Sequence, residues 1–158
     1  MSAQVTEYNC KDEVLHIIYR KTIPKYITDI ADTYEGKINN RIGINFPMDI
    51  VKDLNKERSK KKDKNEIEEY IDKAKYVVVY KKGDKLTKDH EMLHYKYYID
   101  KEYKNKIKEI WDNMKKDVKK KVLSMLKKMG YPEDNEEILI DEFQAYYYTE
   151  RDNFFGKI

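Results

Sequence analysis

Two of the chain's three histidines, His90 and His94, stand four residues apart with Glu91 between them, in the stretch HEMLH. On a helix, residues four apart lie on one face, so both imidazoles could bind one metal ion. Glu91 would lie beside that face, where a carboxylate could accept a proton from a water molecule held by the ion. The spacing therefore predicts a metal centre on a helix, which still needs a third ligand and elements that hold it in place.

A third ligand is the first requirement, because a catalytic zinc ion usually has three protein ligands and an open fourth position for water. No histidine follows His94 in the sequence. The third ligand is therefore a carboxylate, His16 or absent. Glu142 is the best candidate because the run from Ile138 to Ala145 is otherwise mostly apolar, and an unpaired charge is costly to bury there. Asp141 and His16 come next, although a lone histidine in an apolar strand is more often a packed residue.

These residues resemble the gluzincins, the zinc metallopeptidases in which HExxH on one helix is completed by a glutamate on a following helix. HEMLH matches the first part, and Glu142 followed by Ala145 in DEFQAY resembles the family's Glu-x-x-Ala pattern. The resemblance covers roughly residues 76 to 150. It implies a small zincin-like domain, one bound Zn²⁺ ion and hydrolysis of peptide bonds. HEML also looks like the start of the active-site helix in SprT-like proteases, but those use a third histidine that this chain lacks.

The resemblance also implies a role for each residue. His90, His94 and Glu142 would bind the zinc ion, and Glu91 would activate the zinc-bound water and pass its proton to the leaving amine. Tyr146, four residues beyond Glu142, is the predicted donor to the oxyanion, in preference to the two tyrosines that follow it. A tyrosine cluster in a chain with 15 tyrosines is also typical of core packing.

One position departs from the family's pattern. Many gluzincins carry an acidic residue four places after the glutamate ligand, where it steadies a zinc-binding histidine. Tyr146 occupies that position here. The steadying role therefore falls to the tyrosine hydroxyl, moves to Asp141 or is lost.

Length and pattern predict one α+β domain over residues 1–158, with a short mixed sheet and backing helices in about 1–85 and a mainly helical part carrying the zinc site in about 86–158. The 33 basic residues are nearly balanced by 30 acidic ones, which leaves a net charge of +3. Such a balance is typical of a solvated surface rather than of a polyanion-binding protein.

The first part of the chain alternates predicted strands and helices. A strand is expected over Glu13–Arg20, a helix from Pro24 to Gly36, and a second strand over Ile42–Phe46. A helix then begins near Asp49, and the polar stretch Lys52–Lys64 is expected to be a flexible loop.

A short helix over Ile67–Ala74 follows, unless Asp49–Lys75 is one long helix. Tyr76–Tyr80, with the sequence YVVVY, is the strongest strand prediction. If this strand has a free edge, a substrate peptide could add to it by main-chain hydrogen bonds. The alternative is an ordinary interior strand.

The second part is expected to be helical. The HEMLH helix should run from Leu86 to about Tyr98, with Thr87 or Asp89 as its N-terminal cap. A long lysine-rich helix is predicted from Lys101 to Met129, and a final helix from about Glu136. The long helix has to fold back far enough to bring Glu142 to the two histidines.

One cysteine, Cys10, excludes an internal disulfide and a cysteine-based zinc cluster. The start of the sequence lacks the basic and apolar regions of a signal peptide, and no uncharged run approaches 18 residues. We therefore expect an intracellular protein, cytoplasmic or virion-associated, with no membrane partner. The sequence does not indicate an oligomeric state.

Two other functions belong to different classes. The first is a catalytically inactive zinc-binding structural or virion-type protein with a zincin-like fold. The second is a basic helical module that binds nucleic acid through Lys60–Lys62 and Lys119–Lys121. That function is the less favoured one, and it predicts salt-sensitive binding that survives loss of both histidines.

Overall fold

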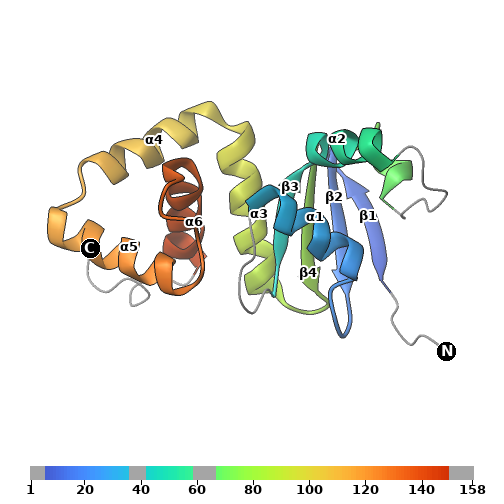
Figure 1. Ribbon diagram of the computed structural model, residues 1–158, viewed down its shortest axis with the longest axis horizontal. Helices are drawn as coiled ribbons and strands as arrows, with labels where there is room; N and C mark the ends of the chain where they lie inside the picture. Colours follow the sequence, from blue (N-terminus) through green and yellow to red (C-terminus); the bar gives the residue numbers. More distant parts are fainter. Residues whose placement is uncertain (1–5, 36–41, 59–66, 150–158) are drawn as a thin grey trace. The chain divides into compact units, whose positions relative to one another are not determined.

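The computed structural model of the chain describes residues 6–35, 42–58 and 67–149 (Figure 1). These residues form a four-stranded mixed sheet and six α-helices, which confirms the predicted α+β class. Contacts divide the described residues into two compact units, the first formed by residues 6–34, 42–58 and 67–88 and the second by residues 35 and 89–149. The sheet belongs to the first unit and the metal-ligand candidates of the HEMLH motif to the second. The organisation as a single domain stays a prediction.

The sheet of the first unit has the strand order β1-β2-β4-β3. β1 (Glu7–Lys11) pairs antiparallel with β2 (Val14–Tyr19), which pairs parallel with β4 (Tyr76–Lys81). β3 (Ile44–Pro47) pairs antiparallel with the other side of β4. The strands predicted over Glu13–Arg20, Ile42–Phe46 and Tyr76–Tyr80 are thereby confirmed, whereas β1 has no counterpart among the predicted elements.

The interior position of β4 corrects one prediction. Its first five residues, YVVVY, are all buried, and β4 is hydrogen-bonded to β2 on one side and to β3 on the other. An apolar run on both faces is typical of such an interior strand. The expected free edge along Tyr76–Tyr80 for a peptide is therefore wrong. The edges of the sheet are β1 and β3, and the latter ends at Pro47, a residue that edge strands tolerate.

Two helices, α1 (Lys25–Glu35) and α2 (Met48–Arg58), pack against one face of the sheet and bury its core. α1 confirms the predicted backing helix. The core residues they share with the strands are apolar and almost fully buried: Leu15, Ile17, Ile27, Ile30, Ala31, Ile44, Phe46, Met48, Val51, Val77 and Val79. The unit thus has an apolar core of its own.

Two predictions between α2 and β4 need correction. The stretch Lys52–Lys64, expected to be a loop, is helical as far as Arg58, and its residues 59–64 lie outside the described part of the chain. Lysine, glutamate and arginine are good helix formers, so their charge alone does not end a helix. The expected helix over Ile67–Ala74 is reduced to a 3₁₀ turn at Glu68–Tyr70, which also excludes one long helix over Asp49–Lys75.

The HEMLH motif lies on α3 (Lys85–Ile99), close to the predicted range. The cap of α3 is neither Thr87 nor Asp89. The carboxylate of Asp84 accepts hydrogen bonds from the backbone N–H of Thr87 at 3.1 Å and from its hydroxyl at 2.6 Å. The prediction of the cap is therefore wrong by a few residues, because Thr87 is the donor of the capping contact and Asp84 the acceptor.

An Asp84→Ala substitution is expected to lower the free energy of unfolding by about 1 kcal/mol, because the first turn of α3 loses its capping acceptor. Asp89→Ala changes an exposed carboxylate later in the same helix and should cost less than about 0.5 kcal/mol. Urea unfolding of the two variants gives the comparison. Equal losses would contradict the assignment of the cap.

In the second unit, α4 (Lys101–Asp112) and α5 (Lys116–Lys128) take the place of the single helix predicted over Lys101–Met129. Asn113 ends α4, and Lys115 has extended backbone angles, with φ −60° and ψ 145°, before α5 begins. The prediction of one continuous helix is wrong because the three-or-four spacing of apolar residues continues across the break. After this break the chain packs against residues of α3 and α4.

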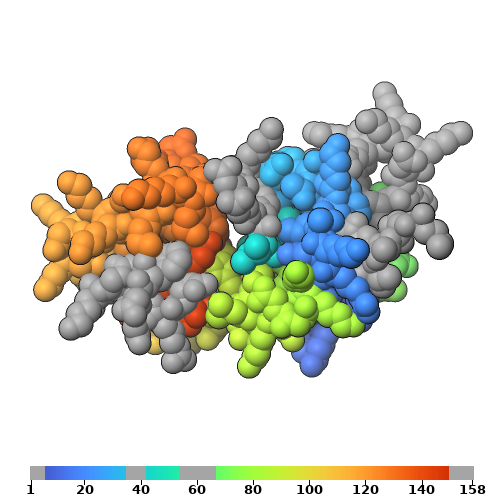
Figure 2. Space-filling view, turned by 90° about the horizontal axis from the view of Figure 1, so that it is seen from below, coloured from blue at the N-terminus to red at the C-terminus, as the bar shows by residue number. Residues whose placement is uncertain are grey.

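α6 (Glu136–Thr149) follows a turn and confirms the predicted final helix. It shares one core with α3, α4 and α5, formed by buried side chains of all four helices and the turn: Tyr97, Ile107, Trp111, Val122, Leu126, Tyr131, Leu139, Ile140 and Phe143. Lysine side chains cover the outside of α5, and Figure 2 shows side chains of this orange segment projecting from the surface. In the part of the chain that the structure describes, none of the helices is long and apolar enough to cross a membrane.

Candidate metal centre

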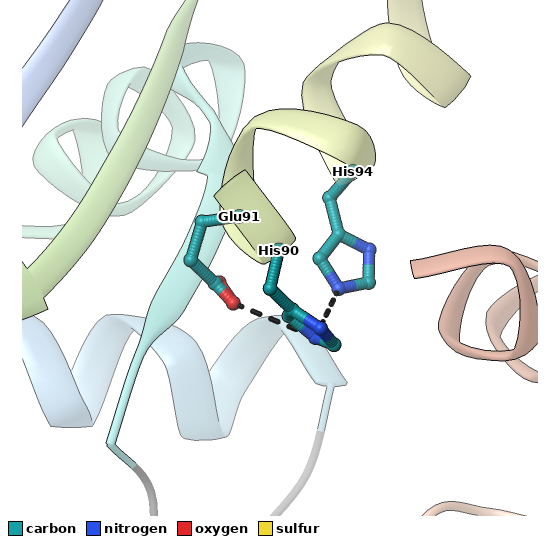
Figure 3. Close-up of side chains that lie close together, drawn as sticks. All are labelled: His90, Glu91 and His94. Carbon is teal, nitrogen blue, oxygen red and sulfur yellow. Dashed lines mark hydrogen bonds and ion pairs between the residues drawn. The ribbon is translucent and has the colours of Figure 1, made fainter. Parts of the chain in front are cut away.

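α3 presents His90, Glu91 and His94 together (Figure 3). The Nε2 atoms of the two histidines lie 3.3 Å apart, and a carboxylate oxygen of Glu91 lies 3.9 Å from Nε2 of His90. One ligand atom from each of the three residues lies within 4.8 Å of the others. The predicted helical spacing thus gives a group that is close enough to hold a metal ion.

Glu142 reaches the same point from α6. Its Oε1 lies 3.0 Å from Nε2 of His94 and 3.8 Å from Nε2 of His90. The side chain is only 4% exposed, and Oε1 has no hydrogen-bond partner among the described residues, because these contacts fall outside hydrogen-bond geometry. A buried carboxylate oxygen without such a partner is costly, and the positive charge of a bound cation or of a protonated His94 would offset that cost.

The donor set formed by His90, His94 and Glu142 fits zinc. Two imidazole nitrogens and a carboxylate oxygen are ordinary zinc ligands, and two ligands at the corners of a tetrahedron with bonds of about 2.05 Å are about 3.3 Å apart. The three donor-to-donor distances of 3.0, 3.3 and 3.8 Å bracket that value. Glu91 contacts His90 at 3.9 Å, so Glu142 is the nearer carboxylate and the better third ligand.

The second nitrogen of each imidazole ring lies beside a polar side chain, within a hydrogen bond at His90 and at ion-pair distance, outside hydrogen-bond geometry, at His94. Nδ1 of His90 lies 3.3 Å from the hydroxyl of Thr149, which donates its own hydrogen to the carbonyl of Ala145 at 2.6 Å. The hydroxyl oxygen therefore accepts from Nδ1–H, and Nε2 of His90 has no proton of its own and can accept a hydrogen bond from Nε2 of His94. Nδ1 of His94 lies 2.9 Å from Oδ1 of Asp141, an ion-pair distance. Both rings thus turn Nε2 toward Glu142.

Asp141 contacts His94, one of the two candidate histidine ligands. Of the three alternatives left open by the sequence, its contact with His94 favours a role that has moved to Asp141. Burial raises the pKa of Asp141, although the neighbouring His94 opposes this.

The charges at His94 and Glu142 are strongly coupled. Burial alone would lower the pKa of His94, but the carboxylates of Asp141 and Glu142 outweigh it and hold this pKa well above its ordinary value. Burial likewise opposes the ionisation of Glu142, yet His94 and His90 keep the pKa of this carboxyl below its ordinary value. Without a metal ion, the pair is therefore a buried imidazolium and carboxylate.

Tyr146 contacts the site through its ring. The ring lies edge-on to His90, with centroids 4.4 Å apart, and its hydroxyl lies 3.3 Å from that of Tyr131. Burial raises the pKa of Tyr146, and the charge of Glu142 adds to this, so the hydroxyl keeps its proton at neutral pH. The next two tyrosines are placed differently: Tyr147 stacks on Phe143, and Tyr148 is exposed. The preference for Tyr146 agrees with this placement, and its role stays a prediction.

His16 lies on β2 in the first unit. Its Nδ1 is 3.1 Å from the hydroxyl of Tyr80, and burial lowers the pKa of His16, with the positive charges of Lys88 and Lys11 adding to the effect. Among the described residues, one group of histidine, cysteine, aspartate and glutamate side chains is spaced for a metal ion, and it consists of His90, Glu91 and His94. Neither His16 nor Glu142 is in this group, but Glu142 lies within 3.8 Å of both histidines. The contacts of His16 agree with the alternative of a packed histidine.

Sequence reasoning missed Thr149, Gln144 and Tyr103, which contact the residues around the centre. Gln144 is fully buried on α6 and donates hydrogen bonds to Asp141 and to the carbonyl of Leu93. The signal that singled out Glu142, a polar residue in a mostly apolar helix, applies equally to Gln144. Nothing local marks Tyr103, which comes from another helix.

Comparisons with models of known protein families, with curated proteins and with solved structures find no match to this chain. The resemblance to the gluzincins therefore depends on the motif residues and stays a prediction.

Proposed function

We propose that this chain is a zinc-dependent peptidase of gluzincin type with a zincin-like fold. The observation that carries the proposal is the buried Oε1 of Glu142, which has no hydrogen-bond partner among the described residues and lies near Nε2 of both His90 and His94. A base, Glu91, stands beside the same donors. The combination is what metal-assisted hydrolysis of a peptide bond requires.

His90, His94 and Glu142 would hold the zinc ion. Zinc, when bound, would supply a Lewis acid that polarises a carbonyl group and lowers the pKa of a water molecule to about 7. Thr149 and Asp141 orient the two imidazoles for this task.

Glu91 is the proposed general base. Its side chain is 5% exposed, and it projects from α3 on the same side as His90 (Figure 3). It would take a proton from the attacking water and deliver it to the amine that leaves. A carboxylate in that place is close to the ligands without being one of them.

Tyr146 is the proposed donor to the substrate carbonyl oxygen as negative charge develops on it. Its hydroxyl is protonated at neutral pH, and its ring contacts His90, so it is adjacent to the reacting groups. Tyr146→Phe tests this role, with loss of kcat and unchanged zinc content as the expected result.

The activity is tested by incubating the zinc-loaded protein with a library of denatured proteins and identifying new peptide termini by mass spectrometry. Cleavage should stop when the zinc is removed with 1,10-phenanthroline and return when zinc is added back. Absence of new termini from a fully zinc-loaded protein would contradict the proposal.

Zinc affinity should rise with pH. The carboxylates of Asp141 and Glu142 raise the pKa of His94 against the effect of burial, so below that pKa zinc has to displace a proton from the imidazole. Displacement of one proton predicts an affinity that rises about tenfold per pH unit and levels off above the pKa of His94. Chelator competition at pH 6, 7 and 8 measures the slope. In Asp141→Asn the zinc affinity should depend less steeply on pH. A wild-type zinc affinity that does not change with pH would contradict the assignment of a proton to His94.

The burial of the centre also supports a second function, a zinc ion that only ties α3 to α6 in an inactive structural protein. The side chains of His94, Glu91 and Glu142 are each at most 5% exposed, as is usual for structural zinc sites. This function predicts full zinc content without any cleavage, and with no effect of Glu91→Gln.

A further inference from the structure

Gln144 connects three helices at the metal centre. Its side chain is fully buried on α6. Its amide nitrogen donates to the carbonyl of Leu93 on α3 at 3.1 Å and to Oδ1 of Asp141 at 3.0 Å. Its amide oxygen accepts a hydrogen bond of 2.6 Å from the hydroxyl of Tyr103 on α4.

These contacts fix the orientation of the amide. A carbonyl and a carboxylate can only accept hydrogen bonds, so the nitrogen end of Gln144 has to face Leu93 and Asp141. Both of its N–H groups are then used. The hydroxyl of Tyr103 faces the opposite end, and the amide cannot turn over without losing its two bonds to Leu93 and Asp141.

The same contacts lead to His94. Oδ1 of Asp141, which accepts from Gln144, is also the atom 2.9 Å from Nδ1 of His94. Leu93, whose carbonyl Gln144 holds, directly precedes His94 in the chain. Gln144 thus contacts both the backbone that carries this histidine and the carboxylate that faces its ring.

We propose that Gln144, oriented by Tyr103, is a positioning residue of the metal centre. It holds the carboxylate of Asp141 against Nδ1 of His94, so that Nε2 points at the metal position. The side chain of Asp141 is 24% exposed and would gain hydration by turning outward if the amide were absent. This role rests on the proposed function, because it requires His94 to be a zinc ligand.

The test measures the affinity of the full chain for Zn²⁺ by chelator competition. Gln144→Met keeps the length and burial of the side chain and removes its hydrogen bonds, and should weaken zinc binding about 10- to 100-fold. Tyr103→Phe removes one hydroxyl and should weaken it about two- to tenfold. The matched control is Tyr97→Phe, which removes a hydrogen bond between α3 and α6 from Tyr97 to Glu137 and should leave zinc affinity unchanged.

A second arm separates positioning from mere packing. If Gln144 acts through Asp141, then in an Asp141→Ala background neither Gln144→Met nor Tyr103→Phe should weaken zinc binding further. Full additivity in that background would overturn the proposal, and so would wild-type affinity in both single variants. Tyr103→Phe carries the test if Gln144→Met does not fold. A wild-type chain that binds no zinc would overturn the proposed function and this role together, whereas zinc-binding wild type with unaffected variants would overturn only this role.

Discussion

Glu91→Gln is expected to keep its zinc and to lose about 10²- to 10⁴-fold in kcat for peptide hydrolysis. The amide has the size of the carboxylate but cannot take a proton from the attacking water. Glu91 lies 3.9 Å from Nε2 of His90 and farther from the donors than Glu142 is, so its replacement should leave the ligand set intact. The measurement pairs zinc content with initial rates on a peptide that the wild type cleaves.

The control for this variant is Glu109→Gln, which changes an exposed carboxylate on α4 and should leave the rate unchanged. Equal rates for Glu91→Gln and wild type would remove the proposed base. Loss of zinc from Glu91→Gln would instead make Glu91 a ligand, in keeping with its place in the group of possible ligands on α3.

Glu142→Gln is expected to weaken zinc binding by more than about 100-fold, because a neutral amide replaces the anionic ligand. The weaker binding should also reduce the stability that zinc adds to the folded chain. Zinc at a thousand times its dissociation constant stabilises the wild type by about 4 kcal/mol, and a 100-fold weaker site reduces this to about 1.4 kcal/mol. Thermal unfolding with and without zinc measures the difference.

Glu137→Gln is the matched control on the same helix, since Glu137 pairs with Lys104 and Lys108 at the surface and does not contact the histidines that would bind zinc. It should keep the full zinc-dependent stabilisation. Unchanged zinc affinity in Glu142→Gln would move the third ligand to Glu91 or Asp141.

The helix and strand that carry strong local patterns could be predicted from the sequence. The HEMLH spacing places two imidazoles on one face wherever a helix forms, and the α3 geometry follows from that alone. YVVVY predicts a strand for the same local reason. Its place in the interior of the sheet depends on β2 and β3, which pair with it, and the residues of β4 alone do not determine that pairing.

The return of the chain to the metal centre was the least predictable feature. Trp111 before the break and Val122 after it belong to one apolar stripe and one core. The spacing of apolar residues therefore predicts one continuous helix, whereas the structure has two. The fold-back that places Glu142 3.0 Å from His94 depends on this break. Asp141 and Gln144 acquire their partners only once it has formed, which is why the sequence offered Asp141 as one alternative among three.

X-ray absorption at the zinc edge, on protein purified under zinc-replete conditions, shows whether His90, His94 and Glu142 bind zinc. We expect one zinc ion per chain with two imidazole ligands and oxygen ligands in the remaining positions, and the loss of one oxygen ligand in Glu142→Gln. A chain without zinc, a sulfur ligand from Cys10, or an unchanged spectrum in Glu142→Gln would contradict this expectation.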